Sequence, residues 1–276
     1  MAISAKQVNE LRQLTGAGMM DCKKALTEAD GDMEKAVEVL RKKGQKLAAK
    51  RADKEAKEGS VFAKTTEDRK QGVILAINCE TDFVAKNEQF EELGQRILEV
   101  AFNNLPATKE ELLQARMDDR TVEEHLTDMI GKIGEKLEIK DYIKVEGEMI
   151  VEYLHAGNKL GVLVELKNPG GEAVEAGEDI AMQIAAMKPV AVDKDSVDQD
   201  IIERELEIGR DQARAEGKPD NIIEKIAQGK LNKFYKENTL LEQIFVKDSS
   251  MTVAKYLDSV NKGMTVVDFK RVSVFE

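Results

Sequence analysis

Two histidines, two cysteines and many carboxylates are the residues with catalytic chemistry in this sequence of 276 residues. His125 and His155 are too few and too isolated for a histidine-rich metal site. Cys22 and Cys79 form no Cys-x-x-Cys pair, and we interpret both as small core residues with reduced thiols. The phosphate-binding loop, nucleophile elbow and zinc-protease motifs do not occur. The sequence therefore predicts no active site, metal or cofactor, with a two-carboxylate hydrolase as the enzymatic alternative.

The pair Asp82-Phe83 places an acid directly before a large apolar ring. The pair lies in a turn between an expected strand at 72–77 and an expected amphipathic helix that begins at about Glu88. Loops carried by a rigid scaffold often hold functional residues. Phe83 has two interpretations: a lid that folds back on the sheet, or a knob that enters a pocket of a partner protein.

A weak internal repeat relates this turn to a second region of the chain. Each copy predicts a β-hairpin followed by a helix, over 58–103 in the first copy and 146–187 in the second. Each hairpin needs a third strand, and 139–145 and 266–275 could supply them. The second copy has no aromatic residue in its turn at 168–173. The same hairpin and helix can thus be connected without an aromatic ring in the turn. This makes the knob interpretation of Phe83 as well supported as the lid interpretation.

Three short helices are expected before the repeat. The first begins with a capping box at Ser4 and ends at a Gly-Ala-Gly turn at 16–18. This turn starts like a dinucleotide-binding fingerprint but follows a helix instead of a strand, so we interpret it as a connection between helices. Met19 and Met20 come next, and one is expected to pack inward while the other is exposed. The third helix is expected to stop at Gly44.

Two helices with narrow apolar seams, joined by a turn at 217–220, predict an antiparallel coiled-coil hairpin over 196–236. The stretch 41–59 is rich in Lys, Ala and Glu, and we interpret it as a solvated, partly helical linker. A basic contact to an acidic partner is the alternative. The predicted fold class is α+β: a three-helix bundle, a two-part core of antiparallel sheets with flanking helices, and the inserted hairpin. The expected domains are a first domain at 1–45, a linker at 46–58, and two core subdomains at 59–145 and 146–276.

The composition limits the classes of partner. The net charge is −11 and charged residues make up 34% of the chain. An acidic protein is poorly suited to neutralise nucleic-acid phosphates or to bind anionic membranes. The N-terminus has no apolar segment typical of an export signal, and no run approaches 18 apolar residues. We therefore expect a cytoplasmic protein whose partner is another protein.

Two long motifs resemble those of bacterial elongation factor Ts. They are Leu-Thr-Gly-Ala-Gly-Met-Met-Asp-Cys-Lys-Lys-Ala-Leu at 14–26 and Cys-Glu-Thr-Asp-Phe-Val-Ala-Lys-Asn at 79–87. The resemblance covers essentially the whole chain, including 180–186 and the expected hairpin. It implies that the first domain is a three-helix domain like the ubiquitin-associated (UBA) domain. It also implies guanine-nucleotide exchange on elongation factor Tu, without an active site of the protein's own.

The resemblance further implies which residues contact the partner. The segment that displaces magnesium from the partner GTPase corresponds to Thr81, Asp82, Phe83 and Val84, with Asp82 and Phe83 as the principal pair. The other contacts correspond to Met19, Met20, Ile133, Gly134, Met182 and Gln183. Family members often carry His where Gln183 stands, so a role that needs an imidazole is not expected here. Some members continue past the last strand with an extra helical module, and contacts made by that module are expected to be absent or replaced.

A non-catalytic UBA-like adaptor or ribosome-associated scaffold is the alternative function. The two functions differ on Phe83, because an adaptor would not need that ring and an exchange factor would. The resemblance implies no cofactor and no direct contact with nucleic acid. A homodimer formed through the hairpin arms is left open.

Overall fold

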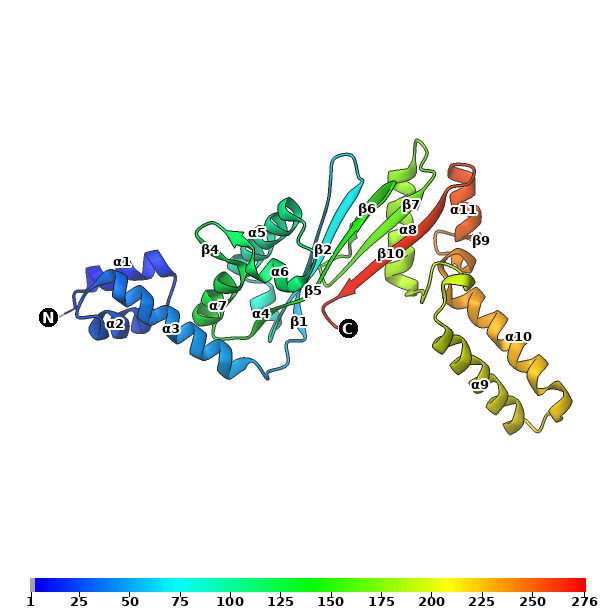
Figure 1. Cartoon of the computed structure of the whole chain (residues 1–276), viewed down its shortest axis with the longest axis horizontal. Coiled ribbons are helices and arrows are strands. Elements are labelled where there is room, and N and C mark those ends of the chain that lie inside the picture. Colours follow the sequence, from blue (N-terminus) through cyan, green and yellow to red (C-terminus); the bar gives the residue numbers. More distant parts are fainter. Residues whose placement is uncertain (1–2) are drawn as a thin grey trace.

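The computed structural model describes residues 3–276. A helical bundle lies at one end, two three-stranded sheets lie in the middle, and a helical hairpin lies at the other end (Figure 1). The strands of both sheets pair antiparallel and helices pack on them, so the expected α+β class is confirmed. Residues 1 and 2 of the expected first domain lie outside the described residues.

Three helices form the bundle: α1 (Ala5–Thr15), α2 (Met19–Glu28) and α3 (Met33–Arg51). α1 begins with the expected capping box, in which the Ser4 hydroxyl accepts from Gln7 N and Gln7 Oε1 accepts from Ser4 N. The buried side chains of the bundle form one small cluster: Val8, Leu11, Ala17, Cys22, Ala25, Leu26, Ala29 and Ala36. Such a small core supplies only modest stability by itself.

α3 is longer than the sequence predicts. It continues through Gly44 to Arg51. Gly44 is buried, and a Cβ there would lie 3.2 Å from the backbone oxygen of Thr127 in α7 (Val122–Ile133). The predicted end at Gly44 was wrong because glycine costs a helix interior only about 1 kcal/mol. The stabilisation from close packing of α3 on α7 exceeds that cost.

The first sheet has the order β1 (Glu58–Thr65), β2 (Gln71–Cys79), β5 (Leu137–Glu146). β5 is the third strand that the first repeat copy required, so that prediction is confirmed. α5 (Glu88–Asn104) and α7 pack on one face, and the second sheet packs on the other. β2 is therefore buried on both faces from its second residue to its end.

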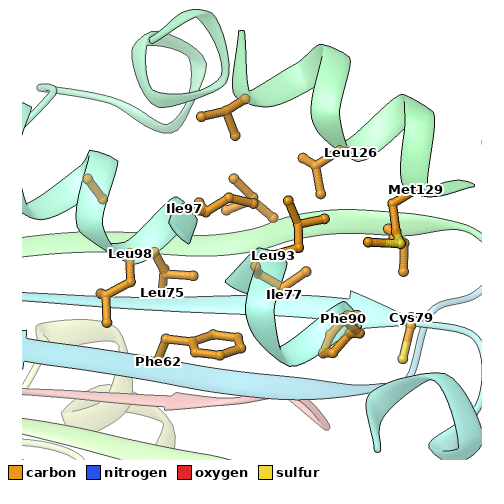
Figure 2. Close-up of a cluster of buried hydrophobic side chains, with 14 of the residues drawn as sticks. Phe62, Leu75, Ile77, Cys79, Phe90, Leu93, Ile97, Leu98, Leu126 and Met129 are labelled. Atoms are coloured by element: carbon orange, nitrogen blue, oxygen red, sulfur yellow. The ribbon is translucent and has the colours of Figure 1, made fainter. Parts of the chain in front are cut away.

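The largest buried cluster lies between the first sheet and its helices. Figure 2 shows Phe62, Leu75 and Ile77 of the sheet facing Phe90 and other side chains of α5. A Cβ on Gly94 of α5 would overlap the Phe62 ring, so the helix can approach the sheet this closely only with glycine at that position. Cys79 is buried in the same cluster, and burial raises the pKa of its thiol to about 12. The thiol is thus a core group, as predicted.

The second sheet has the order β10 (Thr265–Ser273), β7 (Leu160–Lys167), β6 (Met149–Leu154). β10 is the third strand that the second copy required, which confirms that prediction. α8 (Ala173–Met187) and α11 (Val253–Val260) pack on its outer face. The inner faces of the two sheets share one apolar cluster: Val61, Ile74, Ala76, Ile150, Leu163, Val272 and Val274.

α9 (Gln199–Ala215) and α10 (Asp220–Asn238) form the helical hairpin that points away from the sheets (Figure 1). Their close approach is visible at Gly209, where a Cβ would lie 3.0 Å from Ala227 Cα. The remaining elements are α4 (Asp82–Ala85), α6 (Lys109–Gln114), β3 (Arg116–Met117), β4 (Arg120–Thr121), η1 (Lys194–Ser196), η2 (Leu240–Glu242), β8 (Ile244–Phe245) and β9 (Asp248–Thr252).

Candidate partner-binding site

The pair Asp82-Phe83 lies on α4, a single helical turn that directly follows β2. Thr81 caps this turn, because its hydroxyl accepts a hydrogen bond from Val84 N at 3.4 Å. Phe83 is 82% exposed, whereas Val84 and Ala85 are buried in the cluster under α5. The lid interpretation of Phe83 is therefore wrong: the ring points into solvent, and the residues after it fill the core.

Two carboxylates fix the start of α4. The Arg51 guanidinium donates to both Glu80 oxygens at 2.7 and 2.9 Å, and Lys136 N donates to Glu80 at 2.6 Å. Thr81 donates through its backbone N and its hydroxyl to Glu135, at 3.1 and 2.9 Å. Burial favours the neutral form of Glu80, but the Lys136 hydrogen bond and the Arg51 charge outweigh it and lower the pKa of Glu80. The ring is thus displayed on a rigid support.

Asp82 is ionised beside the exposed ring. Lys86 Nζ donates to Asp82 Oδ2 at 2.8 Å, one turn further along the chain. This hydrogen bond and the lysine charge lower the pKa of the Asp82 carboxyl. The carboxyl is also about half exposed. The segment therefore presents one apolar and one negatively charged group side by side.

The structure brings the predicted segments 81–84 and 133–134 together. Gly134 ends α7 in the left-handed region, with φ +85°, and Glu135 follows it. Because Glu135 accepts both hydrogen bonds from Thr81, the end of α7 lies against the start of α4. Ile133 and Gly134 are half-buried. Two stretches 50 residues apart in the sequence thus form one surface.

Met19 and Met20 open α2 and are 58% and 63% exposed. The expectation that one of them packs inward was wrong, because the bundle core closes at Cys22 and leaves the first turn outside it. The turn before them lies close to α7, since a Cβ on Gly16 would be 3.3 Å from the Lys132 side chain. The methionine turn and the end of α7 are therefore neighbours.

Gln183 is completely buried, unlike the surface contact that the sequence predicted. Its amide nitrogen donates to Gln243 Oε1 at 3.0 Å and to the Ile244 oxygen at 3.1 Å, and its amide oxygen accepts from Val246 N at 2.8 Å. These three hydrogen bonds use both amide hydrogens and the amide oxygen, so Gln183 holds the segment 243–246 in place. Met182 beside it is half-buried.

Three exposed apolar side chains near these sites were not predicted from the sequence: Leu14, Ile244 and Val246. Leu14 continues the apolar spacing of α1, so periodicity alone assigns it to the core. Ile244 and Val246 flank the buried Phe245. This alternation is the two-residue period of a strand with one exposed face, and it could have predicted both exposed side chains from the sequence.

Within residues 3–276, no group of three or more His, Cys, Asp or Glu side chains is placed to hold a metal ion. None of the helices in that range is both long enough and apolar enough to cross a membrane. The site instead consists of exposed apolar side chains on short, firmly held helical turns. This geometry suits the anchor residues of a protein–protein interface. Fold and site together define an α+β protein with a surface suited to binding another protein.

Comparison with known proteins identifies the family. A model described as Elongation factor TS matches residues 80–276. A protein named Elongation factor Ts from Amoebophilus asiaticus is 54% identical over 275 residues, covering 99% of each chain. The protein of that name from Cytophaga hutchinsonii is 55% identical over 274 residues, again covering 99% of each chain. The one from Clostridium botulinum is 48% identical over 267 residues, covering 94% of this chain and 88% of that protein. This chain belongs to the elongation factor Ts family.

Proposed function

We propose that this protein is the guanine-nucleotide exchange factor of translation elongation, which binds elongation factor Tu in its GDP form and promotes release of GDP. Family membership supports the role in elongation. The observation that carries the mechanism is Phe83, an apolar ring 82% exposed on a turn held by hydrogen bonds on both sides. A UBA-like adaptor or ribosome-associated scaffold would not need such an exposed ring. The names of the relatives do not favour this alternative function.

The proposed mechanism acts on the magnesium ion of the partner. A P-loop GTPase holds GDP through backbone contacts to the phosphates and through Mg²⁺, which demands near-ideal octahedral geometry. A rigid ring inserted beside that ion needs to shift its ligands only slightly to weaken it. Phe83 supplies the ring, and Asp82 supplies a charged oxygen next to it. Factor and nucleotide then weaken each other's binding to the same extent, which is the linkage that exchange requires.

Within the proposed segment 81–84 the four residues have different tasks. Phe83 and Asp82 meet the partner. Thr81 caps the turn and is fixed by Glu135, and Val84 is buried in the core, so these two hold the pair in position. No bond is made or broken in the exchange reaction. The protein accelerates it by binding energy and not as an enzyme with its own active site.

Further contacts extend the proposed interface along the molecule. Met19 and Met20, together with Leu14, would dock on the GTPase domain, beside Ile133 and Gly134. Beside the second sheet, on α8, the predicted contact at Met182 and Gln183 is made through the segment 243–246 that Gln183 holds. The apolar side chains displayed there are Ile244 and Val246.

The finer architecture is part of the same proposal. The bundle is a UBA-like domain at 1–45, joined through 46–58 to core subdomains at 59–145 and 146–276, and the α9–α10 hairpin is an antiparallel coiled coil. The net charge of −11 supports a protein partner and no direct nucleic-acid contact. The proposed setting is the cytoplasm, where elongation takes place. Pairing of two copies through the hairpin is a proposal that sedimentation of the purified protein tests.

Stopped-flow release of a fluorescent GDP from elongation factor Tu, with Mg²⁺ present, tests the function. The wild type is expected to accelerate release strongly. Phe83→Ala removes a hot-spot ring and is expected to slow the stimulated rate about 30-fold or more, equivalent to at least 2 kcal/mol. Ile208→Ala, at an exposed apolar side chain of the α9–α10 hairpin away from the site, is the control. Failure of the wild type to accelerate release would leave the adaptor.

A further inference from the structure

α3 is a single helix that belongs to two hydrophobic cores. Its first half packs in the bundle cluster through Ala36 and Leu40. Its second half packs on the cluster of the first sheet through Leu47 and Ala48. The helix has 19 residues and is therefore about 28 Å long. No flexible connection separates the two cores along this helix, because it is continuous between them.

A glycine pair seats this helix at the midpoint between the two cores. A Cβ on Gly44 of α3 would lie 3.2 Å from the Thr127 oxygen and 3.6 Å from Gly131 Cα of α7. A Cβ on Gly131 would lie 3.0 Å from Gly44 Cα. The two helix backbones approach closely, and even a methyl group at either position would require the neighbouring backbone to shift. Since glycine in a helix interior costs up to about 1 kcal/mol, the pair is explained by this approach.

The rest of the joint between bundle and core is loosely packed. Three cavities of about 300, 280 and 280 Å³ lie at this joint, all lined by Arg120 and Asp128, and the first is also lined by Gly44 and Gly131. Their walls combine bundle residues with residues of the first core, and many of these side chains are charged. Tight contact between bundle and core is therefore concentrated along α3 and α7.

The far end of α3 reaches the partner-binding site. Arg51, its last residue, makes the two hydrogen bonds to Glu80 that help fix α4. One rigid element thus extends from the bundle that carries Met19 and Met20 to the residue that precedes Thr81. The separation between the methionine turn and Phe83 is set by how α3 sits on α7.

We propose that Gly44 and Gly131 are positioning residues, which hold the bundle at a fixed distance from Phe83 so that one partner molecule engages both surfaces at once. This inference rests on the proposed exchange function. Two contacts fixed at the correct spacing act as a bivalent ligand, because the first contact raises the effective concentration of the second. Loosening the joint removes that advantage and leaves the Phe83 turn itself intact.

The test measures GDP release from elongation factor Tu as a function of the concentration of the full-length protein. Gly44→Leu forces a side chain between α3 and α7 while remaining a good helix former. The matched control is Gly229→Leu, since Gly229 also lies within a helix, α10, and nothing lies within 4 Å of its Cβ position. Gly44→Ala provides a smaller displacement, in case the leucine variant does not fold.

Gly44→Leu is expected to raise the concentration for half-maximal release at least about 10-fold, with a maximal rate within about two-fold of the wild type. Gly44→Ala is expected to raise it about three-fold, and Gly229→Leu to leave it unchanged. Phe83→Ala is expected to give the opposite pattern, with a lower maximal rate. Equal curves for the Gly44 and Gly229 variants would overturn the proposal, and so would a Gly44 variant whose loss lies in the maximal rate.

A distance measurement separates this inference from the exchange function. Nitroxide labels are attached to Lys24→Cys in the bundle and Gln95→Cys in α5, and double electron–electron resonance measures the distance between the two labels. Both native cysteines are buried, so the labels react at the introduced cysteines. A narrow distance distribution is expected for the wild type and a broader or shifted one for Gly44→Ala or Gly44→Leu. A distribution unchanged by both substitutions would overturn the positioning role, whatever the exchange assay gives. If the wild type shows the expected distances but does not accelerate GDP release from elongation factor Tu, only the proposed function is overturned.

Discussion

The two halves of the sheet core repeat one unit but differ in the turn between the central strand and the helix. In the first copy, eight residues (80–87) connect β2 to α5 and form α4 with its exposed ring. In the second copy, five residues (168–172) connect β7 to α8. This shorter turn is tied to the loop before β10, where Asn261 Nδ2 donates to the Asn168 oxygen at 2.9 Å. A Cβ on Gly170 would lie 2.7 Å from Asn261 Cβ.

The difference separates what the scaffold needs from what the function needs. The second turn packs on the loop before β10 of the same chain, and its residues are small or polar. The first turn is held from below, through Glu80 and Thr81, and leaves its largest side chain free. The same unit of hairpin and helix therefore supports both a closed turn and a turn that presents a binding group.

The largest expected effect distinguishes a structural ring from a displayed one in the first copy. Phe90→Ala removes a buried ring from the cluster in Figure 2 and is expected to lower the free energy of unfolding by about 3–5 kcal/mol. Phe83→Ala is expected to change it by less than about 0.5 kcal/mol, because that ring is exposed. Urea unfolding followed by circular dichroism measures both. Similar losses for the two variants would show that Phe83 supports the fold and would remove the contrast between the turns.

The second copy is expected to depend on an internal amide. Gln183→Ala leaves Val246 N and Gln243 Oε1 without their buried partner and is expected to cost about 2–3 kcal/mol of unfolding free energy. Gln13→Ala, at an exposed position of α1, is the control and should stay within about 0.5 kcal/mol of the wild type. A Gln183 variant as stable as this control would mean that the amide does not hold the segment 243–246.

Much of the fold could be predicted because the signals are local. The strand at 72–77 is an unbroken apolar run, and each hairpin lacking a third strand pointed to a partner strand further along the chain. The errors concern contacts between distant segments. Gly44 looks like a helix end until α7 packs on it, and Gln183 looks exposed until residues 60 positions away accept its hydrogen bonds. The sequence left two interpretations of Phe83, and the exposure of its ring on α4 decides between them.

A smaller effect concerns the carboxylate beneath the displayed ring. The fold lowers the pKa of Glu80, so its charged form contributes stability at neutral pH that is lost as the pH falls through the carboxylate range. Glu80→Gln is expected to cost about 1 kcal/mol at pH 7, because Arg51 and Lys136 N lose a charged acceptor. The gap between wild type and variant should begin to narrow as the pH falls below about 4.5 and close below the lowered pKa of Glu80. A gap that is the same at pH 7 and pH 4 would contradict this. Glu38→Gln, at an exposed site of α3, is the control.

The smallest effect has the opposite sign and lies in the second copy. Glu165 of β7 is partly buried, faces Asp268 across the strand pair, and burial together with that like charge raises its pKa. Its charged form therefore costs stability, and the cost disappears as the pH falls through the raised pKa. Glu165→Gln is expected to raise the free energy of unfolding at pH 7 by about 0.5 kcal/mol, and this advantage should shrink at acid pH. Thermal melts of both proteins between pH 4 and 8 measure it. If Glu165→Gln were less stable than the wild type at pH 7, Glu165 would stabilise its sheet, and the contrast with Glu80 would disappear.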